Sequence, residues 1–309
     1  MTLLAVVLHV VALLASPIGM VGVINRTKAI WAGRKGPPLL QFLFDLTRLL
    51  RKAPVYSHVT TPIFWIAPLV ALATALVSGL AVPLLGYAAP ISFPFDFVAV
   101  AYLWGLGRVF VILAALDAGS SFEGLGASRE ATFGALVEPA LFLCMGTLAA
   151  ATGHDTFASI VHVGLGSSDR IATTAGCAIA LFVVLQVESS RVPVDDPQTH
   201  LELTMIHEVM ILDHSGPDLA ALQYASAMKL TLLAALVAAV INPVPFQTSP
   251  AIATVTHLAT MLALALAVGC VESLVARLKL KALPQYIVVA TVATFIALLA
   301  TAWRLGSGG

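Results

Sequence analysis

The chain contains eight apolar segments, each close in length to the roughly 20 residues with which a helix crosses a lipid bilayer. They cover residues 3–24, 62–85, 95–116, 132–151, 171–187, 219–241, 251–275 and 283–303. With 59% hydrophobic and 10% charged residues, the composition lies far from that of soluble globular domains. The sequence therefore predicts a single all-α membrane domain over residues 1–309, in which the fifth segment is the shortest span.

The distribution of lysine and arginine predicts how these spans are oriented. With the N-terminus outside, the cytoplasmic loops hold twelve Lys and Arg residues, whereas the outer loops hold only Arg170 and Arg304. One of these inner connections, residues 118–130, is rich in small side chains and is predicted to be a loop. The first span is longer than the apolar part of a signal peptide and has no basic residue before it, so we expect it to stay as an anchor.

Residues 25–61 form a basic cytoplasmic segment with an amphipathic part. Arg34 and Lys35 precede a Gly-Pro-Pro breaker, and residues 39–52 then place an apolar stripe opposite Asp45 and several basic residues. This pattern predicts a helix lying at the cytoplasmic interface, where it can dock a partner or the membrane surface. A basic flank that only stops translocation would explain the charges but not the apolar stripe.

Several ionisable residues lie inside the predicted spans, toward their cytoplasmic ends. At about 1.5 Å per helical residue, Arg108 lies roughly 12 Å, Glu138 roughly 9 Å and Lys229 roughly 15 Å from those ends. Glu188 and Glu272 lie near the inner rim. A charge at the bilayer centre costs about 2.5–3.5 kcal/mol, so such residues pair, change protonation or line water. Two hypotheses follow: a static Arg108–Glu138 clamp between helices, or a hydrated half-channel that handles protons.

The stretch 186–230 holds about half of the chain's 16 acidic residues, and residues 188–218 within it are predicted to form an acidic cytoplasmic loop. Residues 191–197 (RVPVDDP) are typical of an extended connector because of their two prolines. Thr199 and Glu202 form a capping box that would open a helix running to about Leu212. In this helix Glu202 either only caps or is also a buried acid.

The loop also contains side chains that could bind a metal: His200, His207, Glu208, Asp213 and His214. His207-Glu208 begins a motif like that of zinc proteases, but Ile211 stands where the second histidine would be, which excludes that class. A polar cytoplasmic face of the helix explains the same residues. The three cysteines lie in separate spans without iron–sulfur or zinc spacing, and no nucleotide-binding glycine motif is present. We therefore expect no cofactor on this chain.

Four motifs give the chain a resemblance to a known family. They are RKGP at residues 34–37 with LLQ at 39–41 and Asp45, GASRE at 126–130 with Glu138 behind it, RVPVDDP at 191–197, and HLELTMIHEVMILDHSGPDL at 200–219. Over roughly residues 25–285 the chain resembles the heel subunit of the membrane arm of respiratory complex I. The last motif is the most specific and is similar to the membrane subunits of formate hydrogenlyase, hydrogenase-4 and other energy-converting hydrogenases.

The resemblance implies an integral protein of the prokaryotic inner membrane that couples redox chemistry to ion translocation. Its partners would be hydrogenase-like large and small subunits and an iron–sulfur subunit on the cytoplasmic side, antiporter-like membrane subunits and the lipid bilayer, with no nucleic acid. A nickel–iron (NiFe) centre and iron–sulfur clusters would lie on those partners. The family's acidic funnel would correspond to Glu138, Glu202, Glu208 and Asp213, with Glu188 and Arg191 at its rim.

Resemblance and depth together predict two sets of functional residues. The charge-relay set is Glu138, Glu202, Glu208, Asp213, Glu188, Arg108, Lys229 and Glu272. The set expected to dock the peripheral arm is Arg34, Lys35, Asp45, Glu123, Arg129, Glu130, Arg191, Asp195 and Asp196. No residue is predicted to be catalytic or to bind a cofactor or metal.

Two departures from the family's sequence pattern affect which of the family's properties we expect in this chain. Only Pro38 separates the RKGP and LLQ motifs, where complex I relatives have a longer insert beside the quinone entrance, and this weighs against a bound quinone. Gln223-Tyr224 stands where relatives often have Glu-Tyr, which weighs against a proton relay at that position.

The predicted function is a non-catalytic coupling subunit that links redox in a peripheral arm to proton or sodium translocation. There are two alternatives. A secondary transporter would have broken helices at corresponding positions of two halves, and no such symmetry is visible in the sequence. A passive membrane anchor would not need acids at membrane depth.

Overall fold

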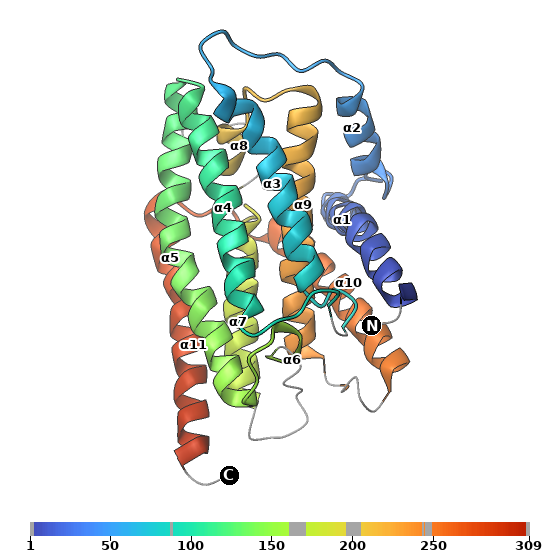
Figure 1. The fold of residues 1–309 in the computed structure, drawn as a ribbon, viewed down its shortest axis with the longest axis vertical. Coiled ribbons are helices and arrows are strands. Elements are labelled where there is room, and N and C mark those ends of the chain that lie inside the picture. Colours follow the sequence, from blue (N-terminus) through green and yellow to red (C-terminus); the bar gives the residue numbers. More distant parts are fainter. Residues whose placement is uncertain are drawn as a thin grey trace.

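The computed structural model describes residues 3–86, 89–160, 171–195, 205–242, 244 and 249–306. Within these residues eight helices are long and apolar enough to span a membrane. They are α1 (Leu3–Trp31), α3 (Pro62–Ala81), α4 (Asp96–Asp117), α5 (Ser121–Thr152), α7 (Ile171–Glu188), α9 (Gly216–Ile241), α10 (Pro250–Leu274) and α11 (Leu283–Gly306) (Figure 1). The predicted all-α architecture and its eight spans, including the short fifth one, are confirmed.

Short helices lie in several connections of the described chain. They are α2 (Gln41–Leu50), α6 (Phe157–Ile160), α8 (His207–Met210) and the 3₁₀ helix η2 (Leu280–Ala282). Helix α2 falls inside the amphipathic segment predicted for residues 39–52. Leu46 is buried against the bundle, whereas Phe44 and Leu50 are exposed, so α2 keeps apolar side chains free for lipid or a partner.

Side chains at the helix ends tie neighbouring spans together. Thr61 caps α3 by accepting from the Ile63 amide at 3.4 Å, and Pro62 occupies the first turn, where a missing N–H costs nothing. The Asp117 carboxylate at the end of α4 accepts from the backbone N and hydroxyl of Thr61, at 2.6 and 3.0 Å. The start of α3 is therefore fixed to the end of α4.

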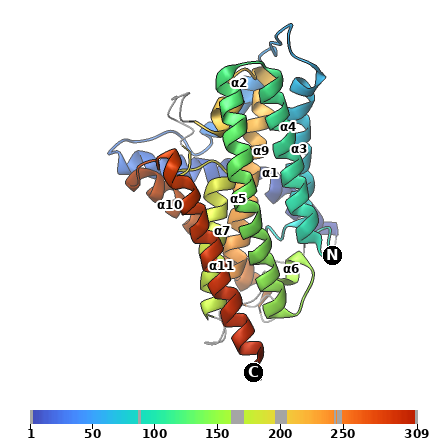
Figure 2. The same ribbon diagram turned by 90° about the vertical axis from the view of Figure 1, so that its left-hand side faces the viewer.

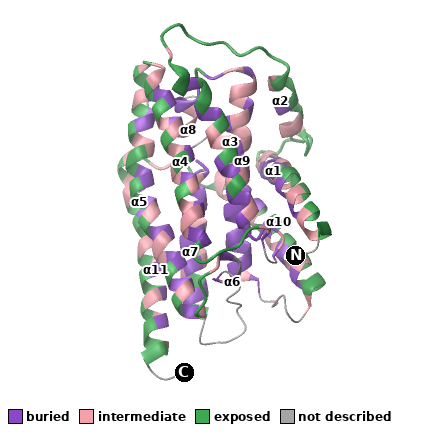
Figure 3. Cartoon of the chain, in the orientation of Figure 1, coloured by how far each residue is buried: buried purple, intermediate pink, exposed green. Residues whose placement is uncertain are grey.

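Helix α9 lies in the middle of the bundle and packs against α1, α3, α7 and α10. Of the window that would span the membrane, 78% is buried, the largest share among the described spans. Figure 3 shows buried residues concentrated on α9 and on the inner faces of its neighbours. Its alanines, including Ala234, Ala235 and Ala238, let the neighbouring backbones approach closely, as small residues do in membrane helix interfaces.

The predicted inner connections gather toward one end of the bundle. Figure 1 places the α2–α3 connection, the α4–α5 turn and α8 at that end and α6 at the other. The end of α1 reaches the end of α10, where Lys28 pairs with Glu272 at 2.8 Å and the Trp31 indole donates to Cys270 Sγ at 3.2 Å. Figure 2 shows α10 and α11 meeting on the flank of the bundle near this point. Which side of the membrane this end faces remains a prediction.

Helix α5 begins at Ser121, so the prediction of a loop over residues 118–130 is wrong beyond residue 120. Gly126 shows the physical reason. A Cβ at this position would lie 2.4 Å from Val209 Cγ1 and 2.9 Å from the Ile206 carbonyl oxygen. Gly126 therefore lets α5 approach α8 and its N-cap residue Ile206, and it does not interrupt the helix.

The helix predicted from Thr199 to about Leu212 is only partly described. Residues 196–204, with Asp196, His200 and Glu202, lie outside the described residues. Of the remainder, only His207–Met210 are helical, so the prediction is wrong at 205–206 and 211–212. The Asp195 carboxylate accepts from the backbone N of Ile206 and His207, both at 3.0 Å, and this cap starts the helix at His207.

The connection from α8 to α9 packs against the start of α3. His214 lies face to face with Phe64, with ring centroids 4.0 Å apart, and is 3% exposed. Neither imidazole nitrogen has a hydrogen-bond partner among the described residues. Burial lowers the pKa of His214 to about 4, against an opposing effect of the Asp218 and Asp213 carboxylates.

Replacing Gly126 by alanine should destabilise the packing of α5 against residues 206–209. Overpacking costs about 1–3 kcal/mol, which exceeds the gain of about 1 kcal/mol in helix propensity. Gly124→Ala is the matched control, because nothing lies within 4 Å of a Cβ there. Thermal unfolding of the purified protein and protease sensitivity of residues 205–215 measure the effect. Equal behaviour of the two variants would contradict this packing role.

The buried His214 should make the protein less stable as the pH falls from about 6.5 toward about 4. In this range the unfolded chain binds a proton at its ordinary imidazole, whereas the folded chain, with the lowered pKa, does not. His214→Phe keeps the stack on Phe64 and removes the titration, so its unfolding temperature should vary less with pH. Identical pH slopes for wild type and variant would show that His214 is not the group responsible.

Candidate functional site

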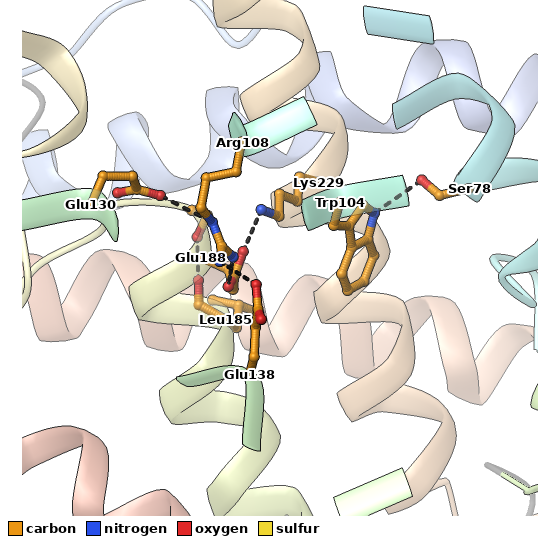
Figure 4. Close-up of polar contacts among 9 residues, drawn as sticks. Ser78, Trp104, Arg108, Glu130, Glu138, Leu185, Glu188 and Lys229 are labelled. Atoms are coloured by element: carbon orange, nitrogen blue, oxygen red, sulfur yellow. Dashed lines mark hydrogen bonds and ion pairs between the residues drawn. The ribbon is translucent and has the colours of Figure 1, made fainter. Parts of the chain in front are cut away.

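Arg108 is the centre of a charge cluster inside the bundle (Figure 4). From α4 its Nη1 donates to Glu138 Oε1 at 2.6 Å, its Nη2 contacts Glu188, and its Nε lies 3.4 Å from Glu130 Oε1. Helix α5 supplies Glu130 and Glu138, about two turns apart, and α7 supplies Glu188 as its last residue. The structure thus contains the Arg108–Glu138 pair expected from their depths, within a larger cluster.

A glycine makes room for the guanidinium between the two carboxylates of α5. Glu130, Gly134 and Glu138 follow one another at four-residue spacing and so share one face of the helix. A Cβ on Gly134 would lie 2.4 Å from Arg108 Nη1 and 3.0 Å from Cζ. Any larger residue at this position would push the guanidinium away from α5.

Lys229 adds a second cation to the cluster from the central helix α9. Its ammonium pairs with Glu188 Oε2, so Glu188 is shared between Lys229 and Arg108. The same ammonium lies 5.8 Å from the centre of the Trp104 ring, a distance at which a cation is attracted to an aromatic face. The Trp104 indole N–H donates to Ser78 Oγ at 3.0 Å, which holds the ring in place (Figure 4).

The cluster carries more negative than positive charge. Three carboxylates face two cations, so the sum is −1 when all five groups are ionised. The side chains of Glu188, Arg108, Glu130 and Lys229 are 4, 9, 15 and 16% exposed, whereas Glu138 is 44% exposed. Buried charges are costly unless they are compensated, so the excess favours uptake of one proton or cation.

A cavity of about 70 Å³ adjoins the cluster between α3, α4, α5, α7, α8 and α9. Its polar lining comprises Arg108, Glu130, Glu188, Lys229, His207, Ser226 and Thr74. A water molecule needs roughly 10–15 Å³ of such space and two to four polar partners, so the cavity can hold several waters. His207 belongs to α8, which connects the cavity with the acidic loop. Glu138 does not line the cavity and contacts Arg108 from another side.

Glu272 belongs to a separate cluster near the end of α10. Its fully buried carboxylate pairs with Lys28 at 2.8 Å and with Arg191 at 3.3 Å. Arg191 follows Glu188 closely in sequence, yet it pairs with Glu272 and not with the Arg108 cluster. The structure therefore places Arg108, Glu138, Glu188 and Lys229 of the predicted charge-relay set in one cluster and Glu272 in another.

Asp195 is the centre of a third group, which shapes the start of the acidic loop. Besides capping α8, it pairs with Arg277 at 2.9 Å and is fully buried. Arg129 on α5 donates to the Met205 carbonyl at 2.8 Å, and the Leu278 backbone N donates to the Pro193 carbonyl at 2.9 Å. Asp195, predicted to dock the arm, thus holds the start of the loop in shape, and its part in docking stays a prediction.

The other predicted residues lie as follows. Arg34 and Lys35 are exposed after α1, Asp45 pairs with Arg48 at 2.6 Å on α2, and Glu208 is half-buried in α8. Glu123 is buried and accepts from the Asp213 backbone N at 3.1 Å, while the Asp213 residue itself is exposed. The described residues contain no group of three or more potential ligands placed for a metal ion. His200 lies outside them, so the metal hypothesis stays untested.

Sequence reasoning missed Trp104, Gly134 and the cavity position of His207, and it placed Glu130 only in the docking set. Two signals could have found them. Trp104 lies four residues before Arg108 and therefore on the same face of α4. The pattern Glu-x-x-x-Gly-x-x-x-Glu places two acids on one face of a helix, with a glycine between them that leaves space for another side chain.

Comparisons with known proteins agree with this fold. The chain matches the profile of the NADH dehydrogenase family over residues 3–303. It is 30% identical to hydrogenase-4 component C of Escherichia coli over 238 residues, which are 76% of this chain and 73% of that protein. It is 29% identical to formate hydrogenlyase subunit 4 of Escherichia coli over 230 residues, 73% of this chain and 71% of that protein.

The fold is also found in a solved structure, that of the membrane-bound sulfane sulfur reductase, an archaeal respiratory membrane complex. The TM-score is 0.79 at 20% identity, covering 95% of this chain and 98% of the matched chain. At this identity the match supports the fold alone. The family match over residues 3–303 confirms the resemblance seen in the sequence motifs: this chain belongs to the NADH dehydrogenase family.

Proposed function

We propose that this chain is the membrane coupling subunit of a hydrogenase-like or complex I-like oxidoreductase complex in the prokaryotic inner membrane. It would link redox chemistry in a peripheral arm to translocation of protons or sodium ions by neighbouring subunits. The observation that carries the proposal is the Arg108 cluster, in which five ionisable groups inside a membrane bundle adjoin a cavity that can hold water. Its similarity to hydrogenase-4 component C and formate hydrogenlyase subunit 4 supports the same role.

The arrangement supports charge movement more than a fixed clamp. A clamp needs only one acid for one base, whereas Arg108 faces three carboxylates and Lys229 shares one of them. A shared carboxylate can change partner with a small movement, because both cations already touch it. The excess negative charge favours binding of a proton by the cluster when the electrostatic potential around it changes.

The two alternatives fit less well. A secondary transporter of the broken-helix kind needs spans interrupted at the membrane centre, but each of the eight described spans is one continuous helix. A passive anchor gains nothing from charged residues at membrane depth, which are expensive to insert and are associated with function.

Partner subunits would approach from two directions in this proposal. The end that holds α2, the α4–α5 turn and α8 would face the peripheral arm, where hydrogenase-like subunits would carry the nickel–iron centre and iron–sulfur clusters. Antiporter-like membrane subunits would lie beside α4 and α5, because Glu138 is 44% exposed at membrane depth. A carboxylate there needs a donor that lipid cannot supply.

The α2 end should face the cytoplasm, because it carries most of the lysine and arginine outside the spans. Single cysteines placed at Lys35 and at Asp155, on opposite ends of the bundle, should react with a membrane-impermeant thiol reagent only from inside and only from outside, respectively. Spheroplasts present the outer face of the membrane to the reagent, and inverted vesicles present the cytoplasmic face. Labelling of the Lys35 position from outside would overturn the proposed orientation.

Glu138→Gln should uncouple the complex. The variant keeps the size of the side chain and removes the charge that Arg108 binds, so redox activity with artificial dyes should persist while the ion gradient per electron falls. The measurement is the pH or sodium gradient formed by proteoliposomes of the whole complex. Asp155→Asn, which removes an exposed acid at the other end, is the control.

Two other results would count against this role for Glu138. Poor assembly of the Glu138→Gln complex would favour the static clamp, because loss of one partner leaves the buried Arg108 charge less compensated. An undiminished gradient per electron in an assembled complex would rule out a coupling role for Glu138.

A further inference from the structure

We propose that Lys229 is the proton-exchanging base of the Arg108 cluster, and that Arg108 transmits its charge state to Glu138 without conducting a proton itself. This inference rests on the proposed coupling function and names the group through which the cluster would work. Three features of the described residues carry it: the chemistry of the two cations, the two partners of Lys229, and the position of Arg108 between the cavity and Glu138.

The first feature is that only one of the two cations can release a proton. A guanidinium stays protonated in proteins, whereas a lysine amine titrates when its surroundings change. Arg108 is therefore a fixed positive charge that holds carboxylates and repels a migrating proton. Lys229 lines the cavity, so waters there can reach its Nζ.

The second feature is that the Lys229 ammonium has two partners of different kinds. It pairs with the Glu188 carboxylate and lies 5.8 Å from the centre of the Trp104 ring. The ring attracts the ammonium when Glu188 turns toward Arg108, and it accommodates the neutral amine equally well as an apolar surface. The Ser78 hydrogen bond keeps the ring at this position for both states.

The third feature is that Arg108 separates Lys229 from Glu138. Lys229, Glu188 and Glu130 line the cavity together with Arg108, while Glu138 binds the guanidinium from outside that lining and is partly exposed on the flank. The groups facing Lys229 are thus Glu188 from α7, Arg108 and Trp104 from α4, Glu130 from α5 and His207 from α8. A change of charge at Lys229 therefore reaches Glu138 through Arg108, whose guanidinium contacts both Glu188, the partner of Lys229, and Glu138.

The exchange is a simple acid–base step. The −1 cluster first takes up a proton at Glu138, the exposed acid, where an O–H bond forms and the sum of charges becomes 0. A Lys229 N–H bond then breaks, a cavity water forms the O–H bond of a hydronium ion, and the lysine is left as a neutral amine. This release restores the sum of −1, and the reverse sequence resets the cluster. No electron moves in either step.

Lys229→Arg is the decisive variant, because it keeps the positive charge near Glu188 and Trp104 but removes the exchangeable proton. We expect the complex to assemble and to keep redox activity with artificial dyes, while the gradient per electron falls at least about tenfold, since positioned proton-transfer groups contribute roughly 10²–10⁴-fold. A gradient within about twofold of wild type would overturn the proposal, because charge alone would then suffice. Lys281→Arg, the same change at an exposed lysine outside the cluster, is the control and should pump normally.

The double variant Glu188→Gln with Lys229→Gln covers the case in which the longer arginine prevents assembly. It removes one acid and one base together, so the sum of charges in the cluster stays at −1 and assembly is favoured. Loss of pumping with retained dye activity supports proton exchange at Lys229, and normal pumping overturns it. Failure of the coupling function itself would look different, since Glu138→Gln would then also leave the gradient undiminished.

Discussion

The Arg108 guanidinium is the interaction on which the arrangement of the bundle depends. The group is planar and holds its N–H donors in fixed directions. Its nitrogens contact Glu138 and Glu130 on α5 and Glu188 on α7. Through Glu188 the same network reaches Lys229 on the central helix α9. Four spans are therefore held in register by charges that would be expensive to bury singly, since removal of one partner from a buried pair costs about 3–5 kcal/mol.

Close backbone packing makes this network possible. Gly134 leaves the space that the guanidinium fills on α5, and Gly107 lets α4 approach Thr74 of α3, where a Cβ would lie 2.7 Å from the threonine hydroxyl. Gly126 does the same for the contact of α5 with α8. Between membrane helices, packing and hydrogen bonds replace the hydrophobic effect as the driving force, so small residues decide where polar groups can meet.

The sequence allowed the spans to be predicted well, because each is a long apolar run whose length is set by the bilayer. It also predicted that Arg108 and Glu138 lie at comparable depth, since rise per residue converts position into height. It could not predict the partners of Glu188, because Arg191 and Arg108 were both within reach and only the packing of α4 against α5 and α7 decides between them. The loop expected at residues 118–130 is wrong beyond residue 120 because packing was also not visible in the sequence: Gly126 makes a close contact between α5 and α8 and does not form a turn. The separate position of Glu272 depends on α1 continuing to Trp31, where Lys28 can reach it.

The three carboxylates of the cluster differ in exposure, so its cavity side and its outer side are not equivalent. Glu188 and Glu130 face the cavity and are nearly buried, whereas Glu138 is open on the flank of α4 and α5, and the guanidinium lies between them. A continuous chain of carboxylates and water would let protons leak through whenever the cavity is hydrated. A permanent cation in that chain prevents the leak, because a hydronium ion would have to pass a like charge at close range in a medium of low dielectric constant. The same cation still transmits the field of any group that changes charge beside it, so a fixed arginine can separate proton pathways and couple their occupancies at the same time.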